Sequence, residues 1–178
     1  MEFKSIAVFC GSKTGNNQLY MEHATALGSL LAHKNILLIY GGGNKGIMGA
    51  VANAVLEHKG NVIGIIPEVL LGWEQQHEGL SELIVVENMH IRKRMMYEKC
   101  DAAIILPGGF GTLDELFEML TWNQLSIHDK PIYMINTGGF YDSLFDHMKK
   151  MVQENFLYGS LSDAFTVVNE PHEIFASV

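Results

Sequence analysis

The sequence predicts an α/β fold built on a parallel sheet of about seven strands with covering helices. Short runs rich in Ile and Val alternate with amphipathic stretches of helical length, which is the pattern of strands joined by helices in a parallel sheet. Several of these runs end in a turn of small residues, which marks the passage from strand to helix. A chain of 178 residues, 48% of them hydrophobic, is long enough to build a core, so we expect a single domain over residues 1–178.

The expected elements follow from the same alternation. Strands are predicted at residues 6–10, 36–40, 62–66, 83–86, 102–106, 131–136 and 165–168. Helices are predicted around residues 16–34, 47–60, 89–100, 112–127 and 141–155. The stretch 68–82 is predicted to be a loop over one edge of the sheet. Ligands of open parallel sheets bind outside the carboxyl ends of the strands, so we expect the glycine turns to meet at one crevice.

The charge balance and the cysteines limit the class of protein. A formal charge of −8 argues against a broad surface for nucleic acid or an anionic membrane, so any bound anion must be held locally. Cys10 and Cys100 lie outside any C-x-x-C motif, which fits two free thiols in a reducing compartment. The first apolar run is too short for a secretory signal, and no window approaches the length of a membrane span. We expect a cytoplasmic protein without nucleic-acid or membrane partners.

The stretch P-G-G-F-G-T, residues 107–112, is the first candidate ligand loop. Gly108, Gly109 and Gly111 would let the backbone approach a ligand closely, and the helix behind them would present unpaired N–H groups with a partial positive charge. Thr112 could cap this helix or donate its hydroxyl to a phosphate oxygen. The loop therefore predicts a phosphate cradle, and an ordinary strand-to-helix turn is the alternative.

A second loop spells G-x-G-x-x-G. Gly41, Gly43 and Gly46 follow a predicted strand, and Glu68 lies about twenty residues further on, which alone would suggest a dinucleotide site. Glycine-rich α/β proteins produce this match easily. With a phosphate-type loop downstream, one small nucleotide shared between the two loops is at least as good an interpretation.

The carboxylate of Glu115 has two interpretations. Thr112 to Glu115 fits a capping box, in which the Glu side chain accepts a hydrogen bond from the backbone of the cap residue. A carboxylate one turn from a phosphate cradle would repel the ligand, however, unless the chemistry requires it there. A structural and a catalytic role are both open at this point.

The segment E-N-M-H-I-R-K-R supplies positive charge. Asn88 fits a helix cap, which places Arg92, Lys93 and Arg94 in or near the first turns, where cations oppose the helix dipole. An anionic ligand or an acidic partner would offset that cost. The alternative is a solvated basic face, which suits Arg94 best. The eight histidines show no paired ligand spacing, so no metal site is predicted.

Four stretches together resemble one family closely: GSKTGNNQLY, YGGGNKGIMGAVANAV, ENMHIRKR and PGGFGTLDELFEMLTWNQLSIHDKPI. They resemble the Lonely Guy (LOG) family of cytokinin riboside 5′-monophosphate phosphoribohydrolases, long mislabelled as lysine decarboxylases. The resemblance runs from about Ile6 to Phe156. It implies a Rossmann-like, doubly wound parallel sheet with helices on both faces. It also implies a homodimer that hydrolyses the N-glycosidic bond of a purine nucleoside monophosphate to free base and ribose 5-phosphate, without a cofactor.

The resemblance also implies roles for single residues, with Arg92 and Glu115 as the catalytic pair. The other implied contacts are Gly108, Gly109, Gly111 and Thr112 for the phosphate cradle, and Ser12, Gly43, Met89 and Lys93 elsewhere on the nucleotide. A carboxylate suits this chemistry, because cleavage of the C–N bond builds positive charge on the sugar. The residues after Gly43 depart from the commoner family pattern, which leaves the choice between adenine and N6-modified adenine open.

Two other functions compete with this one. A nucleotide or cofactor carrier could use the same loops, but it would have no need of a carboxylate beside bound phosphate. A lysine decarboxylase would need pyridoxal phosphate on a lysine, and the purified protein would then be yellow. For the dimer, we expect the apolar side of the helix with Leu116, Leu120 and Trp122 to contribute to the interface.

Overall fold

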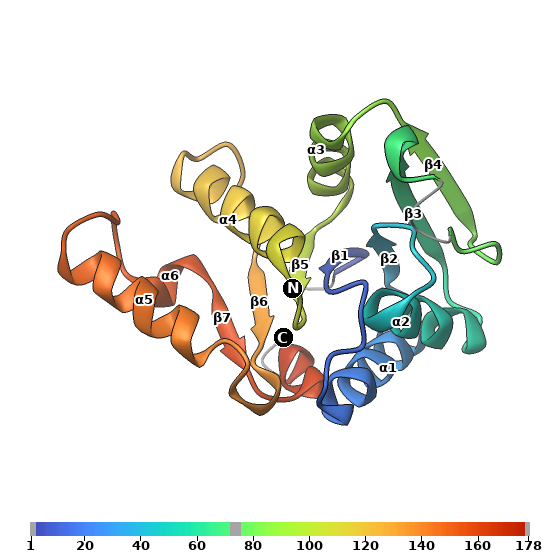
Figure 1. Cartoon of the computed structure of the whole chain (residues 1–178), viewed down its shortest axis with the longest axis horizontal. Helices are drawn as coiled ribbons and strands as arrows, with labels where there is room; N and C mark the ends of the chain where they lie inside the picture. Colours follow the sequence, from blue (N-terminus) through green and yellow to red (C-terminus); the bar gives the residue numbers. More distant parts are fainter. Residues whose placement is uncertain (1–2, 72–75, 177–178) are drawn as a thin grey trace.

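The centre of the computed structural model, which describes residues 3–71 and 76–176, is a seven-stranded parallel sheet (Figure 1). Its strands lie in the order β4-β3-β2-β1-β5-β6-β7. Their bounds are β1 Ser5–Phe9, β2 Leu37–Tyr40, β3 Val62–Pro67, β4 Glu82–Val86, β5 Ala102–Ile105, β6 Ile132–Ile135 and β7 Thr166–Val168. Strand order reverses at β1, where Ile6 pairs with Leu38 of β2 on one side and with Ala102 of β5 on the other.

Helices cover both faces of the sheet, as the doubly wound prediction requires (Figure 1). On one side lie α3 Met89–Lys99, α4 Phe110–Gln124 and α5 Asp142–Gln153, and on the other α1 Gln18–His33 and α2 Gly46–Glu57. The shorter helices are η1 Glu68–Leu70, η2 Thr137–Gly139, α6 Leu161–Ala164 and η3 Pro171–Phe175. The predicted fold class is confirmed. Every predicted strand and helix is present, with ends displaced by three residues at most.

Side chains of the central strand alternate between two apolar cores. Ile6 and Val8 of β1 pack with α1 and α2, whereas Ala7 and Phe9 pack with α3, α4 and α5. A strand buried on both faces carries a continuous apolar run, which is why the strands could be recognised in the sequence.

The stretch predicted as a loop over one edge, residues 68–82, begins with η1 and ends at the start of β4. Residues 72–75 of this stretch lie outside the described residues. Beyond them, Gln76 forms a bridge with Gly43, and the N–H of His77 donates to the carbonyl of Gly42 at 3.0 Å. None of the helices in the described ranges combines the length and the apolar character that a membrane crossing needs.

Candidate active site

Three turns meet at the carboxyl edge of the sheet, after β1, β2 and β5. The N–H of Gly11 in the first turn donates to the carbonyl of Pro107 at 3.0 Å. The carbonyl of Gly11 accepts from the N–H of Met48 in α2 at 3.2 Å. The β1 turn is therefore hydrogen-bonded to the segments that follow both neighbouring strands. This is the position at which open parallel sheets bind ligands.

The glycines of the β5 turn are not equivalent. A β-carbon on Gly108 would overlap the hydroxyl oxygen of Thr112 and lie 2.9 Å from the backbone nitrogen of Gly11, so only glycine fits there. A β-carbon on Gly109 or Gly111 would meet nothing within 4 Å. The packing of the protein explains Gly108, but it does not explain the two open glycines.

Helix α4 begins at Phe110, with Gly109 as the N-cap residue and no side-chain cap. Thr112 lies inside the first turn, only 3% exposed, with its hydroxyl beside Gly108. The prediction that Thr112 and Glu115 form a capping box is therefore wrong. The helix starts two residues before its sequence pattern predicts, because an extended glycine serves as the cap. The first N–H groups of such a helix have no partner within it and carry its positive dipole end.

A cavity of about 500 Å³ opens between the β1 turn, the β5 turn and the first turn of α2, and its size suits a small-molecule ligand. Seven of the ten predicted site residues line it: Ser12, Arg92, Gly108, Gly109, Gly111, Thr112 and Glu115. Arg92 comes from α3, Glu115 from α4 and Ser12 from the β1 turn. The fold thus brings side chains from distant segments to one cavity.

Arg92 is buried, with 6% of its surface exposed. The Asn88 side chain accepts from the N–H of Ile91 at 3.0 Å, which confirms Asn88 as the cap of α3 and fixes the turn that carries Arg92. Arg92 Nη1 donates to the sulfur of Met89 at 3.7 Å. Arg92 Nε is buried and has no hydrogen-bond partner among the described residues. A buried guanidinium donor of this kind is suited to an anionic ligand.

Glu115 is also buried, with 8% of its surface exposed, and its side chain lines the cavity. Cys10 lies on the same cavity wall, and its thiol pKa is raised by burial and, second, by the negative charge of Glu115. The hydroxyl of Tyr97 on α3 donates to the backbone carbonyl of Glu115 at 3.2 Å, which ties this turn of α4 to α3.

Three predicted residues do not line the cavity: Gly43, Met89 and Lys93. The ammonium of Lys93 pairs with Asp114 at 3.0 Å and with Glu118 at 2.8 Å. Burial alone would lower the pKa of Lys93, but hydrogen bonds and charges from these two carboxylates outweigh it and raise the pKa. Direct contact between Lys93 and a nucleotide stays a prediction.

Part of the cavity wall is apolar and was not predicted. It includes Tyr20, Ile47, Met48 and Phe140, together with Phe110 at the helix start. The rings of Tyr20 and Phe140 meet edge to face, with centroids 5.6 Å apart. Phe140 follows the turn N-T-G-G after β6, and the position of that turn at the same sheet edge was the available signal.

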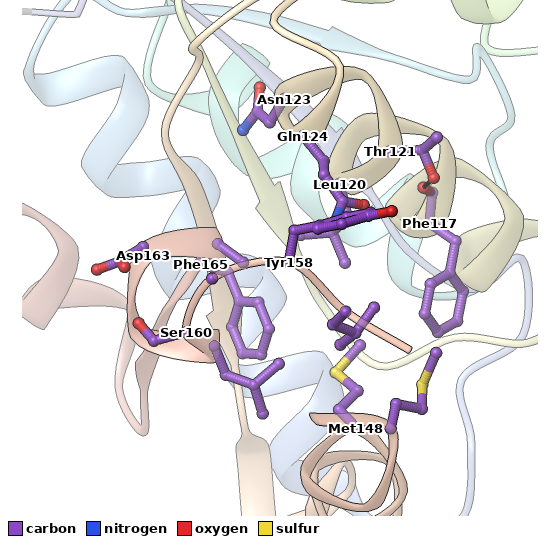
Figure 2. Close-up of a pocket in the computed structure, with 15 residues that line it drawn as sticks. Phe117, Leu120, Thr121, Asn123, Gln124, Met148, Tyr158, Ser160, Asp163 and Phe165 are labelled. Atoms are coloured by element: carbon purple, nitrogen blue, oxygen red, sulfur yellow. Dashed lines mark hydrogen bonds between the residues drawn. The ribbon is translucent and has the colours of Figure 1, made fainter. Parts of the chain in front are cut away.

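A second cavity lies between α4, α5 and the segment around α6. It has a volume of about 320 Å³ and a mostly apolar lining. Figure 2 shows that the rings of Phe117, Tyr158 and Phe165 face this second cavity, with Met148 below them in the view. None of the predicted site residues lines it, and none of the glycine turns after β1, β2 and β5 reaches it.

Comparison with known proteins identifies relatives over most of the chain. The family model described as "Possible lysine decarboxylase" matches residues 48–178. A cytokinin riboside 5′-monophosphate phosphoribohydrolase of Arabidopsis thaliana is 47% identical over 156 residues, which are 88% of this chain and 73% of the relative. A second enzyme of that name from the same plant is 46% identical over 155 residues, 87% of this chain and 73% of the relative.

Among solved structures, the molybdenum cofactor binding protein from the phototrophic bacterium Rippkaea orientalis superimposes with a TM-score of 0.73. It is 22% identical in sequence, and the match covers 99% of this chain and 98% of that one. At this identity the likeness shows a shared fold. The matched family model and the identity to the plant enzymes show more: the chain belongs to the Lonely Guy (LOG) family of cytokinin riboside 5′-monophosphate phosphoribohydrolases.

Proposed function

We propose that the protein hydrolyses the N-glycosidic bond of purine nucleoside 5′-monophosphates and releases the free base and ribose 5-phosphate. One observation carries the proposal: the buried carboxylate of Glu115 and the guanidinium of Arg92 line the same cavity as the glycine turn at the start of α4. Membership of the family and the names of the plant relatives support the same reaction.

The phosphate is proposed to bind at the N-terminus of α4. Gly109 and Gly111 leave open space above the backbone there, and the first N–H groups of the helix point toward its N-terminal side. The hydroxyl of Thr112 lies in the same turn. Arg92 can add charge-assisted hydrogen bonds, which are about twice as strong as neutral ones.

Glu115 is proposed to stabilise the reacting sugar. When the bond between C1′ and the base nitrogen breaks, its electron pair leaves with the base, and positive charge develops on the ribose ring. A fixed carboxylate stabilises that charge, and it can orient the water whose oxygen forms the new bond to C1′. The proton lost by the water balances the one gained by the base.

The remaining predicted residues are proposed to contribute in different ways. Ser12 lines the cavity and can bond the nucleotide directly. Met89 is proposed to help position Arg92, from which its sulfur accepts a hydrogen bond. Lys93 is proposed to help position α4, on which it pairs with two carboxylates. Gly43 is proposed to hold the β2 turn through its bridge to Gln76.

We also propose that the protein is a homodimer of single-domain chains and that it works in the cytoplasm without a cofactor. Of the three residues expected at the interface, Leu116 is fully buried in the core and cannot contribute, whereas Leu120 and Trp122 are partly buried and stay candidates. Ile91, Leu125 and Ile127 are exposed on or beside α3 and α4 and are better candidates. Light scattering at micromolar concentration tests the dimer, and a monomeric mass would reject it.

The proposed cytoplasmic location is supported by the two free, buried cysteines, because free thiols are typical of a reducing compartment.

The test of the reaction is a panel of purine monophosphates, including AMP and an N6-modified AMP, with chromatography for free base and ribose 5-phosphate. We expect base release without added cofactor. Adenosine should react at least about a hundredfold less efficiently, since the charge-assisted phosphate bonds are worth about 1.5–3 kcal/mol each. Binding of AMP without release of adenine would favour the carrier alternative, and equal turnover of AMP and adenosine would reject the phosphate cradle.

A further inference from the structure

We infer that Gly41, the first glycine after β2, is a positioning residue for the guanidinium of Arg92. The inference rests on the proposed function of Arg92 and assigns a reason for the absence of a side chain at position 41. A β-carbon there would overlap Nη2 of Arg92 and lie 3.3 Å from its Cζ. The guanidinium therefore occupies the space that any other residue at this position would fill.

Backbone conformation does not explain this glycine. In the same turn, Gly42 and Gly46 have φ values of 83° and 57°, which favour glycine, whereas Gly41 is not among the residues with positive φ. Gly41 is buried, and it is not one of the residues that line the cavity. It therefore needs neither an unusual backbone nor close approach of a ligand to account for it. What remains is the space around it, where Nη2 of Arg92 is by far the nearest atom and the sulfur of Met48, 3.3 Å from such a β-carbon, is a second and looser contact.

A side chain at position 41 would displace the guanidinium, and the side-chain hydrogen bond that Arg92 makes to Met89 is weak. Nη1 donates to a thioether sulfur at 3.7 Å, which is a weak acceptor, and Nε has no hydrogen-bond partner among the described residues. The absence of a side chain at Gly41 thus leaves the space that Nη2 occupies. A methyl group at position 41 must push it away by more than about 1 Å, because nonbonded atoms separate to about 3.5 Å.

The chain offers a direct readout of this displacement, because its only two arginines are Arg92 and Arg94. Arg94 is exposed and pairs with Glu98, so it serves as an internal reference. In a spectrum of ¹⁵N-arginine-labelled protein, Gly41→Ala should shift the Nε–H signal of Arg92 and leave that of Arg94 in place. AMP turnover should fall about a hundredfold in kcat/KM, as expected for a catalytic group misplaced by about 1 Å.

A double-mutant cycle separates this role from a general structural one. Gly41→Ala should cost activity and stability in the parent but much less in the Arg92→Ala background, where the guanidinium is gone and only the sulfur of Met48, at 3.3 Å, stays close to the added methyl group. If Gly41→Ala fails to fold alone but folds with Arg92→Ala, the coupling is shown by that rescue. Equal losses in both backgrounds, or an unmoved Arg92 signal with parental turnover, would overturn the inference. Parental turnover in Arg92→Ala alone would instead reject the catalytic role of Arg92, while the signal shift still reports on Gly41.

Discussion

The ammonium group of Lys93 on α3 lies 2.8 Å from a carboxylate oxygen of Glu118 on α4. The same carboxylate oxygen lies 3.1 Å from the hydroxyl of Tyr97, whose one proton is shared between it and the backbone carbonyl of Glu115, and Lys93 also reaches Asp114. Arg92 is carried by α3 and Glu115 by α4. The interhelical contact of Lys93 therefore constrains how the two proposed catalytic side chains face each other.

Replacement of Lys93 by Met should destabilise the protein by about 1–3 kcal/mol, because Glu118 then loses a charged partner in a partly buried position. Lys150→Met is the matched control: its ion pair with Glu154 joins side chains that are 62% and 53% exposed, and such pairs are worth about 0–1 kcal/mol. Urea unfolding of both variants measures the difference. Equal losses would mean that the Lys93 contact has no special structural weight.

Tyr97→Phe should reduce the loss of unfolding free energy that the protein shows as pH rises into the alkaline range. Burial first, and then the charges of Glu118 and Glu115, raise the pKa of Tyr97 above its ordinary value near 10. Above about pH 10 the unfolded chain releases this proton while the folded chain keeps it, so stability falls as pH rises. Urea titrations at about pH 8, 9.5 and 11 should show a smaller decline for the variant. An unchanged slope would contradict the contribution of Tyr97.

Glu115→Gln should lower kcat for AMP by about 10²–10³, because the charge that stabilises the ribosyl cation is lost. The unfolding free energy should stay within about 1 kcal/mol of the parent, since Gln has nearly the same shape. Glu98→Gln, on the exposed side of α3, is the control and should keep parental turnover. Adenine release at near-parental rate by the Glu115→Gln variant would remove Glu115 from the mechanism.

Gly111→Ala should separate folding from ligand binding. A β-carbon at this position in the first turn of α4 meets nothing within 4 Å, so the helix should gain about 0.5–1 kcal/mol. The same methyl group would stand where the phosphate is proposed to approach, and kcat/KM for AMP should fall at least about tenfold. Gly108→Ala should instead lose stability, because its β-carbon overlaps Thr112. A more stable Gly111→Ala variant with full AMP turnover would reject the phosphate cradle.

The strands could be predicted because parallel strands buried on both faces give unbroken apolar runs. Most helix bounds followed, because the helices occupy the amphipathic stretches between these runs. The start of α4 could not be predicted, since Gly109 and Gly111 are poor helix formers and Thr112 with Glu115 imitates a capping box. Local spacing placed Glu115 one turn after a glycine loop, whereas its pairing with Arg92 was implied by the family resemblance. Local spacing could not reveal that Lys93 would turn toward α4, because its partner Asp114 lies 21 residues away in the sequence.

The contact between Tyr20 and Phe140 in the apolar wall could not be predicted, for the same reason. Tyr20 belongs to the first helix and Phe140 follows the sixth strand, and their contact exists only once the sheet has formed. Gly41 shows a further limit. In the sequence it belongs to a G-x-G-x-x-G pattern that suggests nucleotide contact, whereas in the fold its neighbour is a side chain from α3.

The hydrogen bond from the Gly11 N–H to the Pro107 carbonyl has a kinetic consequence. This amide can exchange its proton with solvent only when the β1 turn separates from the β5 turn, so its exchange rate measures the opening of the site itself. A nucleotide that bridges the two turns must slow that exchange in proportion to its occupancy, because it binds the closed form. The rate of deuterium uptake at the Gly11 amide therefore reports the fraction of molecules that have nucleotide bound, and it does so independently of an activity assay.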